Sequence, residues 1–127
     1  NDDHHLGSRA YVAAMDEQAK RDLVAMINVD MVGRGPSLVV GRLRETVPET
    51  HTRLVSIARR LGVPVREVAM GDVSDHGTFI KAGMSAGWLW SGEDPVVHSP
   101  GDTFDRVQPA SVERAGRVAL EAARSYT

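Results

Sequence analysis

Cysteine is absent from the 127 residues, which excludes disulfides, thiolate zinc fingers and cysteine nucleophiles. Any metal that the chain binds must therefore take its ligands from histidine, aspartate and glutamate. Aromatic residues are scarce, at 5%, and they do not alternate with basic residues along the sequence. Because no basic stripe is present either, nucleic acid is not an expected partner.

Long apolar runs and an excess of one charge are missing as well. No run in the sequence approaches the roughly 18 apolar residues of a membrane-spanning helix, so a membrane is not an expected partner. The 15 basic and 17 acidic residues nearly cancel, which leaves a formal net charge of −2. The sequence does contain 42% hydrophobic residues, enough for one core. Residues 1–127 are therefore predicted to form a single domain.

Helical and extended patterns alternate along the chain. Helices are predicted from Ser8 to about Met15 and over residues 48–62, 74–83 and 108–126, and strands over residues 22–33, 37–42, 63–70 and 85–90. Gly62 and Gly83 are placed to end two of these helices. The last helix has an apolar face of Val112, Ala115, Val118, Ala119 and Ala122. This alternation predicts a layered α/β/α fold with a mostly parallel or mixed central sheet.

An acidic residue inside an apolar segment is the first candidate for chemistry. Asp30 lies in INVDMV, where every neighbour except Asn28 is apolar. An ionised carboxylate in such a strand costs several kcal/mol unless a cation or hydrogen-bond donors compensate it. Ligands of open α/β sheets gather beyond the carboxyl ends of strands, so Asp30 is a candidate metal ligand. The alternative is that Asp30 caps the turn GRGP.

The stretch Ser74–His76, SDH, opens a predicted helix. One interpretation is helix capping by Ser74 or Asp72. The other is that its hydroxyl and carboxylate groups orient a neighbouring metal ligand.

His98, in the loop PVVHSPGDTFD after the strand at 85–90, is a further candidate, although a lone loop histidine is normally solvated. Imidazole is a common metal ligand and equally a common loop residue. Asp102 and Asp105, which follow it, suit the start of the next turn and helix. His51 stands beside charged residues on a predicted helix and is expected to be solvated.

Four motifs in order carry a family resemblance: GSRAYV, NVDMVG, SDHGTFIKAGMSAGWLWSG and VHSPGDTFD. Together they resemble the C-terminal half of the catalytic domain of the M28 family of zinc aminopeptidases. The resemblance implies a zinc-exopeptidase-like fold that is incomplete at its N-terminus. It also implies that Asp30 binds one zinc and His98 the other. Ser74, Asp75 and His76 would then lie near the metals without binding them and would orient the residues that do.

The resemblance also assigns the first residues of the chain. In the family, a glutamate pair stands just before the Gly-Ser that begins the helix; the first is the general base and the second a zinc ligand. Counting back from Gly7 places Asn1 at the base position and Asp2 at the ligand position. Asn1 cannot accept a proton, while a register shifted by one would use Asp2 and Asp3. Because the family's His-x-Asp would lie upstream, we expect a fragment or truncated form of an enzyme that holds two zinc ions.

The function that the resemblance implies is zinc-dependent hydrolysis of N-terminal peptide bonds, with peptide or protein N-termini as substrates. Phe79, Met84 or Trp90 would then line a pocket for the first side chain, although such residues also suit a core. An inactive binding or dimerisation module and a glutaminyl-cyclase-like acyltransferase remain as alternatives. The family further suggests a secreted or periplasmic protein, and an exposed sheet edge would allow self-association.

Overall fold

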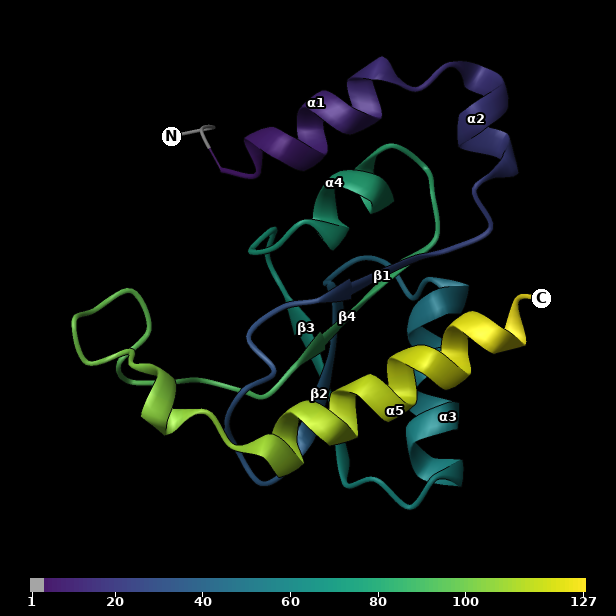
Figure 1. Ribbon diagram of the computed structural model, residues 1–127. Coiled ribbons are helices and arrows are strands. Elements are labelled where there is room, and N and C mark those ends of the chain that lie inside the picture. Colours follow the sequence, from purple (N-terminus) through teal and green to yellow (C-terminus); the bar gives the residue numbers. More distant parts are fainter. Residues whose placement is uncertain (1–3) are drawn as a thin grey trace.

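The computed structural model describes residues 4–127, so the predictions for Asn1 and Asp2 lie outside the described residues (Figure 1). Its elements in chain order are α1 (Leu6–Ala14), α2 (Glu17–Asp22), β1 (Met26–Val29), β2 (Leu38–Leu43), α3 (Glu49–Arg60), β3 (Val65–Met70), α4 (His76–Lys81), β4 (Ala86–Trp90), the 3-10 helix η1 (Phe104–Arg106) and α5 (Pro109–Ser125).

Within residues 4–127, the four strands form one mixed sheet in the order β1-β4-β2-β3. β1 pairs with β4 in parallel, and β2 pairs with β3 in parallel. The two halves join through the antiparallel pair of β2 and β4. The predicted α/β class with a mixed sheet is therefore confirmed.

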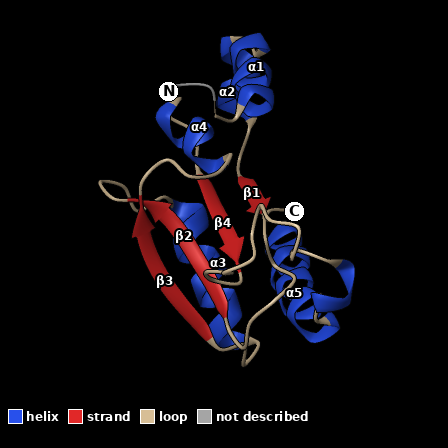
Figure 2. Ribbon diagram, turned by 90° about the vertical axis from the view of Figure 1, so that its left-hand side faces the viewer, coloured by secondary structure: helices blue, strands red, loops and turns tan. Residues whose placement is uncertain are grey.

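Helices cover both faces of this sheet, as Figures 1 and 2 show. α3 and α5 pack on one face, where Leu38 and Val40 of β2 and Leu89 of β4 join the larger core. α4, with α1 outside it, packs on the other face. Val39 and Trp88 point to that side, since alternate residues of a strand face opposite ways. The result is the predicted α/β/α layering.

Two glycines end helices as predicted. Gly62 follows α3 with a φ of 68°, and Gly83 follows α4 with a φ of 83°. Both values lie in the left-handed region, where a side chain is disfavoured.

The buried face of α5 is close to the prediction but shifted. Ala115, Val118 and Ala122 are fully buried, whereas Val112 is 44% exposed. Ser111 is buried in its place. α5, at 17 residues, is the longest helix, and no helix within residues 4–127 is long and apolar enough to cross a membrane.

The N-terminal third differs from the prediction. The first helix begins at Leu6 rather than near Ser8, and the Ser8 hydroxyl instead donates to the carbonyl of His5 at 3.1 Å. The predicted strand over residues 22–33 shrinks to Met26–Val29, because α2 precedes it. Asp16 caps α2 by accepting a hydrogen bond from the Ala19 amide at 2.7 Å, a start signal that the sequence prediction overlooked.

The prediction that His51 is solvated is wrong. Its side chain is 1% exposed and lies on the buried face of α3. Nε2 lies 3.2 Å from the Glu67 carboxylate, and Nδ1 lies 3.4 Å from the Gly41 carbonyl. A Cβ on Gly87 would come within 3.3 Å of the His51 amide nitrogen, so this glycine lets α3 approach the sheet closely. Glu67 of β3 therefore contacts His51, whereas the charged helix neighbours Glu49 and Arg53 pair with each other.

Candidate metal centre

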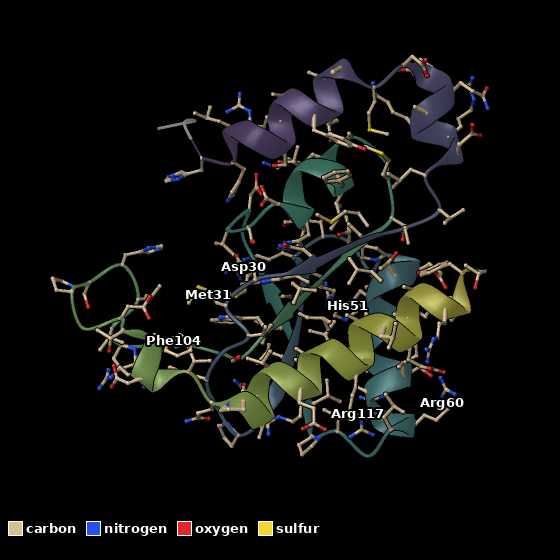
Figure 3. The ribbon with its side chains drawn as sticks, viewed as in Figure 1. Asp30, Met31, His51, Arg60, Phe104 and Arg117 are labelled. Carbon is tan, nitrogen blue, oxygen red and sulfur yellow. The ribbon has the colours of Figure 1, made fainter. Side chains whose placement is uncertain are left out.

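Asp30 directly follows β1, at the carboxyl end of the parallel β1–β4 pair (Figure 3). Its amide donates to the Leu89 carbonyl at 3.1 Å, and Trp88 Nε1 lies 3.4 Å from the Asp30 carbonyl. Met31, the next residue, has a φ of 57°, which turns the chain away from the strand. The backbone at Asp30 is thus fixed while its side chain remains partly exposed.

Two polar side chains form a relay to the Asp30 carboxylate. Asn28 Nδ2 donates to Ser74 Oγ at 2.7 Å, and Ser74 Oγ donates to Asp30 Oδ2 at 2.6 Å. Asn28 and Ser74 are 8% and 3% exposed. The Asn28 side-chain amide occupies the Ser74 oxygen as an acceptor, so the Ser74 hydroxyl proton points to Asp30. The hydrogen bond fixes the position of Asp30 Oδ2. No hydrogen bond occupies Oδ1 within residues 4–127.

For one residue of SDH, the structure excludes the capping interpretation. α4 begins at His76 with Asp75 at its N-cap position, and no side chain donates or accepts a capping hydrogen bond there. Ser74 therefore does not cap the helix but contacts Asp30. Asp72 pairs instead with Lys81. The part of the relay that the sequence analysis missed is Asn28, whose position two residues before Asp30 on the strand was the available signal.

His76 is fully buried, and its ring stacks on Trp88 with 5.2 Å between the ring centroids. Neither ring nitrogen has a hydrogen-bond partner within residues 4–127, so His76 does not contact Asp30 through a hydrogen bond. Burial lowers the pKa of His76 to about 4, although the carboxylates of Asp72, Asp75 and Asp30 act in the opposite direction. The imidazole is therefore neutral near pH 7.

His98 lies in the loop between β4 and η1, with an exposed side chain and a φ of 58°. Because β1 and β4 are parallel neighbours, this loop and Asp30 leave the sheet at the same end. Asp102 lies in the same loop, while Asp105 belongs to η1, as the sequence suggested for the start of the next helix. A hydrogen bond from Thr103 lowers the pKa of Asp105.

Asp30 and His98 are of the residue types that bind zinc, but they are too few to form a complete site. Carboxylate oxygen and imidazole nitrogen are the ligands that zinc takes in a chain without cysteine. However, no three His, Asp or Glu side chains within residues 4–127 converge on one point. The described residues thus provide an oriented carboxylate and an exposed imidazole, and not a complete site.

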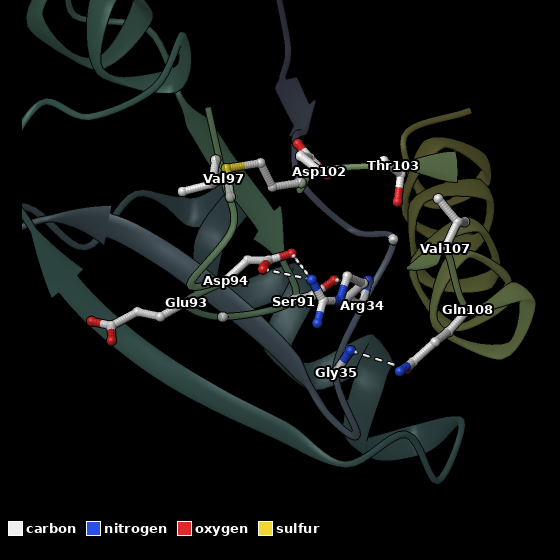
Figure 4. A pocket seen from close by; sticks show the side chains of 13 residues that line it. Arg34, Gly35, Ser91, Glu93, Asp94, Val97, Asp102, Thr103, Val107 and Gln108 are labelled. Atoms are coloured by element: carbon white, nitrogen blue, oxygen red, sulfur yellow. Dashed lines mark hydrogen bonds and ion pairs between the residues drawn. The ribbon is translucent and has the colours of Figure 1, made fainter. Parts of the chain in front are cut away.

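A pocket of about 270 Å³ lies between the loop after β1 and the loop after β4 (Figure 4). Its walls include Met31, Val97 and Val107, and its polar side chains include Arg34 and Asp102. Its lining thus includes Met31, which follows Asp30, and Val97, which precedes His98.

The three residues predicted for a side-chain pocket do not come together. Phe79 and Met84 are 6% and 7% exposed, in one core cluster with Val12. Trp90 belongs to another cluster, where it stacks on Trp88 at a centroid distance of 4.8 Å. All three side chains therefore act as core residues here, the alternative that the sequence left open.

Comparisons with known proteins show which family this chain resembles. The family model described as "Peptidase family M28" matches residues 2–123. The "Probable leucine aminopeptidase" of Arthroderma otae is 30% identical over 84% of this chain. A zinc aminopeptidase from Bacillus subtilis shares the fold over 95% of the chain, with a TM-score of 0.85 and 23% identity. The LapA aminopeptidase of Legionella pneumophila does so over 92%, with a TM-score of 0.81 and 21% identity.

The chain spans about a third of these relatives, covering 31% of the Arthroderma otae protein and 32% of the Bacillus subtilis chain. The match of the family model nevertheless extends over nearly every residue, and it contains Asp30, the SDH stretch and His98. This chain belongs to peptidase family M28.

Proposed function

We propose that this chain forms part of a zinc aminopeptidase and supplies Asp30 as one zinc ligand. The observation that carries the proposal is the relay from Asn28 through Ser74 to Asp30 Oδ2, at 2.7 and 2.6 Å. Partners of this kind hold a ligating carboxylate in one orientation, and their loss typically weakens metal binding. We propose that Oδ1, which accepts no hydrogen bond within residues 4–127, is the oxygen that faces the metal. His98 is proposed as a further ligand, and the family resemblance supports two zinc ions.

Zinc, when bound, lowers the pKa of a coordinated water and polarises a carbonyl group. The residues of this chain contribute orientation and polarity. Ser74 keeps the Asp30 carboxylate from rotating, and the neutral ring of His76, which stacks on Trp88, adds no positive charge to the surroundings. The general base is not assigned to any residue within 4–127.

The proposed substrates are peptides with a free N-terminus, which the names of the aminopeptidase relatives support. The pocket lined by Met31 is the proposed place for the first side chain, because Met31 directly follows Asp30 and Val97 directly precedes His98. Its mixture of apolar and charged walls does not select one side chain over another.

The test uses the protein at the length its gene encodes, stripped of metal by a chelator and then titrated with zinc. Release of nitroaniline from leucine nitroanilide is followed in wild type, Asp30→Asn and Ser74→Ala. Asp30→Asn should lower zinc affinity and activity more than Ser74→Ala, for which a loss of about 10- to 100-fold is expected. Ser56→Ala, which removes an exposed hydroxyl on α3, is the matched control. Asp30→Asn with unchanged zinc affinity would refute the assignment.

A further inference from the structure

Arg34 and Asp94 form an ion pair between the two loops that leave the carboxyl end of the β1–β4 pair. Arg34 Nη1 donates to both carboxylate oxygens, at 2.6 and 2.8 Å (Figure 4). The two side chains are 29% and 13% exposed, so water reaches the pair only in part. Such a pair holds its partners more firmly than an exposed one does.

Asp94 also shapes the turn that precedes His98. Its Oδ1 accepts a hydrogen bond from the Val96 amide at 3.0 Å, and its carbonyl accepts one from the Val97 amide at 3.2 Å. The position of Asp94 therefore sets where the turn to His98 begins.

The rest of this loop is bonded only to itself. Ser99 donates to the Val96 carbonyl through its amide and its hydroxyl, and the Asp102 amide donates to the Ser99 carbonyl. Within the described chain, the Arg34–Asp94 pair is the only hydrogen-bonded link between residues 93–103 and the loop after β1, and the Arg106 amide, which donates to the Thr103 carbonyl at 3.1 Å, ties this loop only to the adjoining η1. Without that link, the loop would depend on its apolar contacts for its place.

The loop after β1, in contrast, is well anchored. The Gly33 carbonyl accepts from the Gln108 amide at 2.8 Å, the Gly35 carbonyl accepts from Arg114, and the Met31 carbonyl accepts from the Ser91 amide. The backbone around Arg34 is therefore well fixed, and the ion pair with Asp94 connects the loop of His98 to it.

We infer that Arg34 and Asp94 are positioning residues, which we call the loop strap, and that they set the distance between Asp30 and His98. Arg34 follows Asp30 by four residues, and Asp94 precedes His98 by four residues, so the strap joins the two segments near both candidate ligands. The inference rests on the proposed function for the role of His98. The strap itself is a property of the metal-free chain.

The first experiment measures the strap without any metal or substrate. Amide hydrogen exchange is followed by mass spectrometry for residues 95–103 in the chelator-treated protein. Arg34→Gln and Asp94→Asn should each raise the exchange rate there by about five- to tenfold, since local opening costs less free energy without the pair. Asp94→Asn keeps an acceptor for the Val96 amide, so it isolates the ion pair from the turn.

Arg34→Lys should restore part of the protection, because it keeps the charge. Arg53→Gln is the matched control, since it removes an Arg–Glu pair of 2.6 Å on α3, away from the loop. Unchanged exchange over residues 95–103 in both Arg34→Gln and Asp94→Asn would overturn the strap. If Arg34→Gln fails to fold, Asp94→Asn decides the same question.

The second experiment measures zinc affinity and leucine nitroanilide kinetics on the protein at the length its gene encodes. Asp94→Asn should weaken zinc binding about tenfold and lower kcat, as expected for misplaced ligands. KM should change as well, because Asp94 lines the pocket proposed for the first side chain. A lower melting temperature with unchanged zinc affinity and kcat would overturn the positioning role. If wild type shows neither zinc binding nor hydrolysis, the proposed function fails, whereas the exchange result still decides whether the strap exists.

Discussion

Acid should destabilise this chain through His76. The ring is fully buried, stacked on Trp88 and without a hydrogen-bond partner within residues 4–127. Burial lowers its pKa to about 4 in the folded chain, against an ordinary value of 6.5. The unfolded chain therefore binds a proton between these two pH values and the folded chain does not. Stability is full above pH 6.5 and falls as the pH drops toward 4.

The size of the effect follows from the two pKa values. Each unit of difference corresponds to about 1.4 kcal/mol, so lowering the pH from 7 to 5 should cost about 2 kcal/mol of unfolding free energy through His76 alone. The remaining cost, about 1 kcal/mol, should appear between pH 5 and 4. Below pH 4 the folded ring is protonated too, and its contribution levels off.

Urea unfolding followed by tryptophan fluorescence, in chelator at pH 7 and pH 5, measures this difference. His76→Phe keeps an aromatic ring against Trp88 but cannot titrate, so its loss of stability from pH 7 to 5 should be smaller than that of wild type by about 2 kcal/mol. His98→Gln removes an exposed histidine and should leave the difference unchanged. Equal losses in wild type and His76→Phe would refute the reasoning.

Three further substitutions test the packing and the caps by urea unfolding. Gly41→Ala should destabilise by about 1–3 kcal/mol, since its Cβ would lie 2.4 Å from a ring carbon of Trp88; a neutral effect would contradict that close approach. Asp16→Ala should cost about 1 kcal/mol by removing the cap of α2, with Glu17→Ala as a control that leaves the cap in place. Tyr126→Phe should cost about 1 kcal/mol, because its hydroxyl donates to a carboxylate on α3 at 2.8 Å, and no change would contradict that bond.

The regular parts of the fold could be predicted because local patterns determine them. Gly62 and Gly83 end helices by backbone geometry alone, and Ala115, Val118 and Ala122 lie on one face because the helical repeat places them there. The short β1 could not be predicted from its apolar run. The apolar residues from 23 to 32 are compatible with one long strand. They are equally compatible with the observed arrangement, in which a connection follows α2 and leads into a short strand.

The site was predictable where one residue violates a local rule. Asp30 stands out because a carboxylate in an apolar strand needs compensation, and the structure provides it in Ser74. Arg34 and Asp94 violate no such rule, since both occur in polar loops, and only the β1–β4 pairing brings them together. His51 was misjudged because its burial depends on residues distant in sequence, namely Glu67, the Gly41 carbonyl and Gly87.

The directions of the strands do not by themselves bring Ser74 to Asp30. β3 is parallel to β2 and β2 is antiparallel to β4, so β3 ends opposite to β1, and the chain after β3 must return before Ser74 meets Asp30. His76, two residues later, rests on Trp88 in that return. Trp88 thus contributes to the position of Asp30 in two ways. Its indole N–H lies near the Asp30 carbonyl, and its ring packs against His76, which belongs to the same segment as Ser74. Trp88→Phe would keep an aromatic ring beneath His76 and lose only the first of these supports. A stronger effect of Trp88→Leu than of Trp88→Phe on zinc affinity would therefore show that the stacked ring, not the indole hydrogen bond, keeps the carboxylate in place.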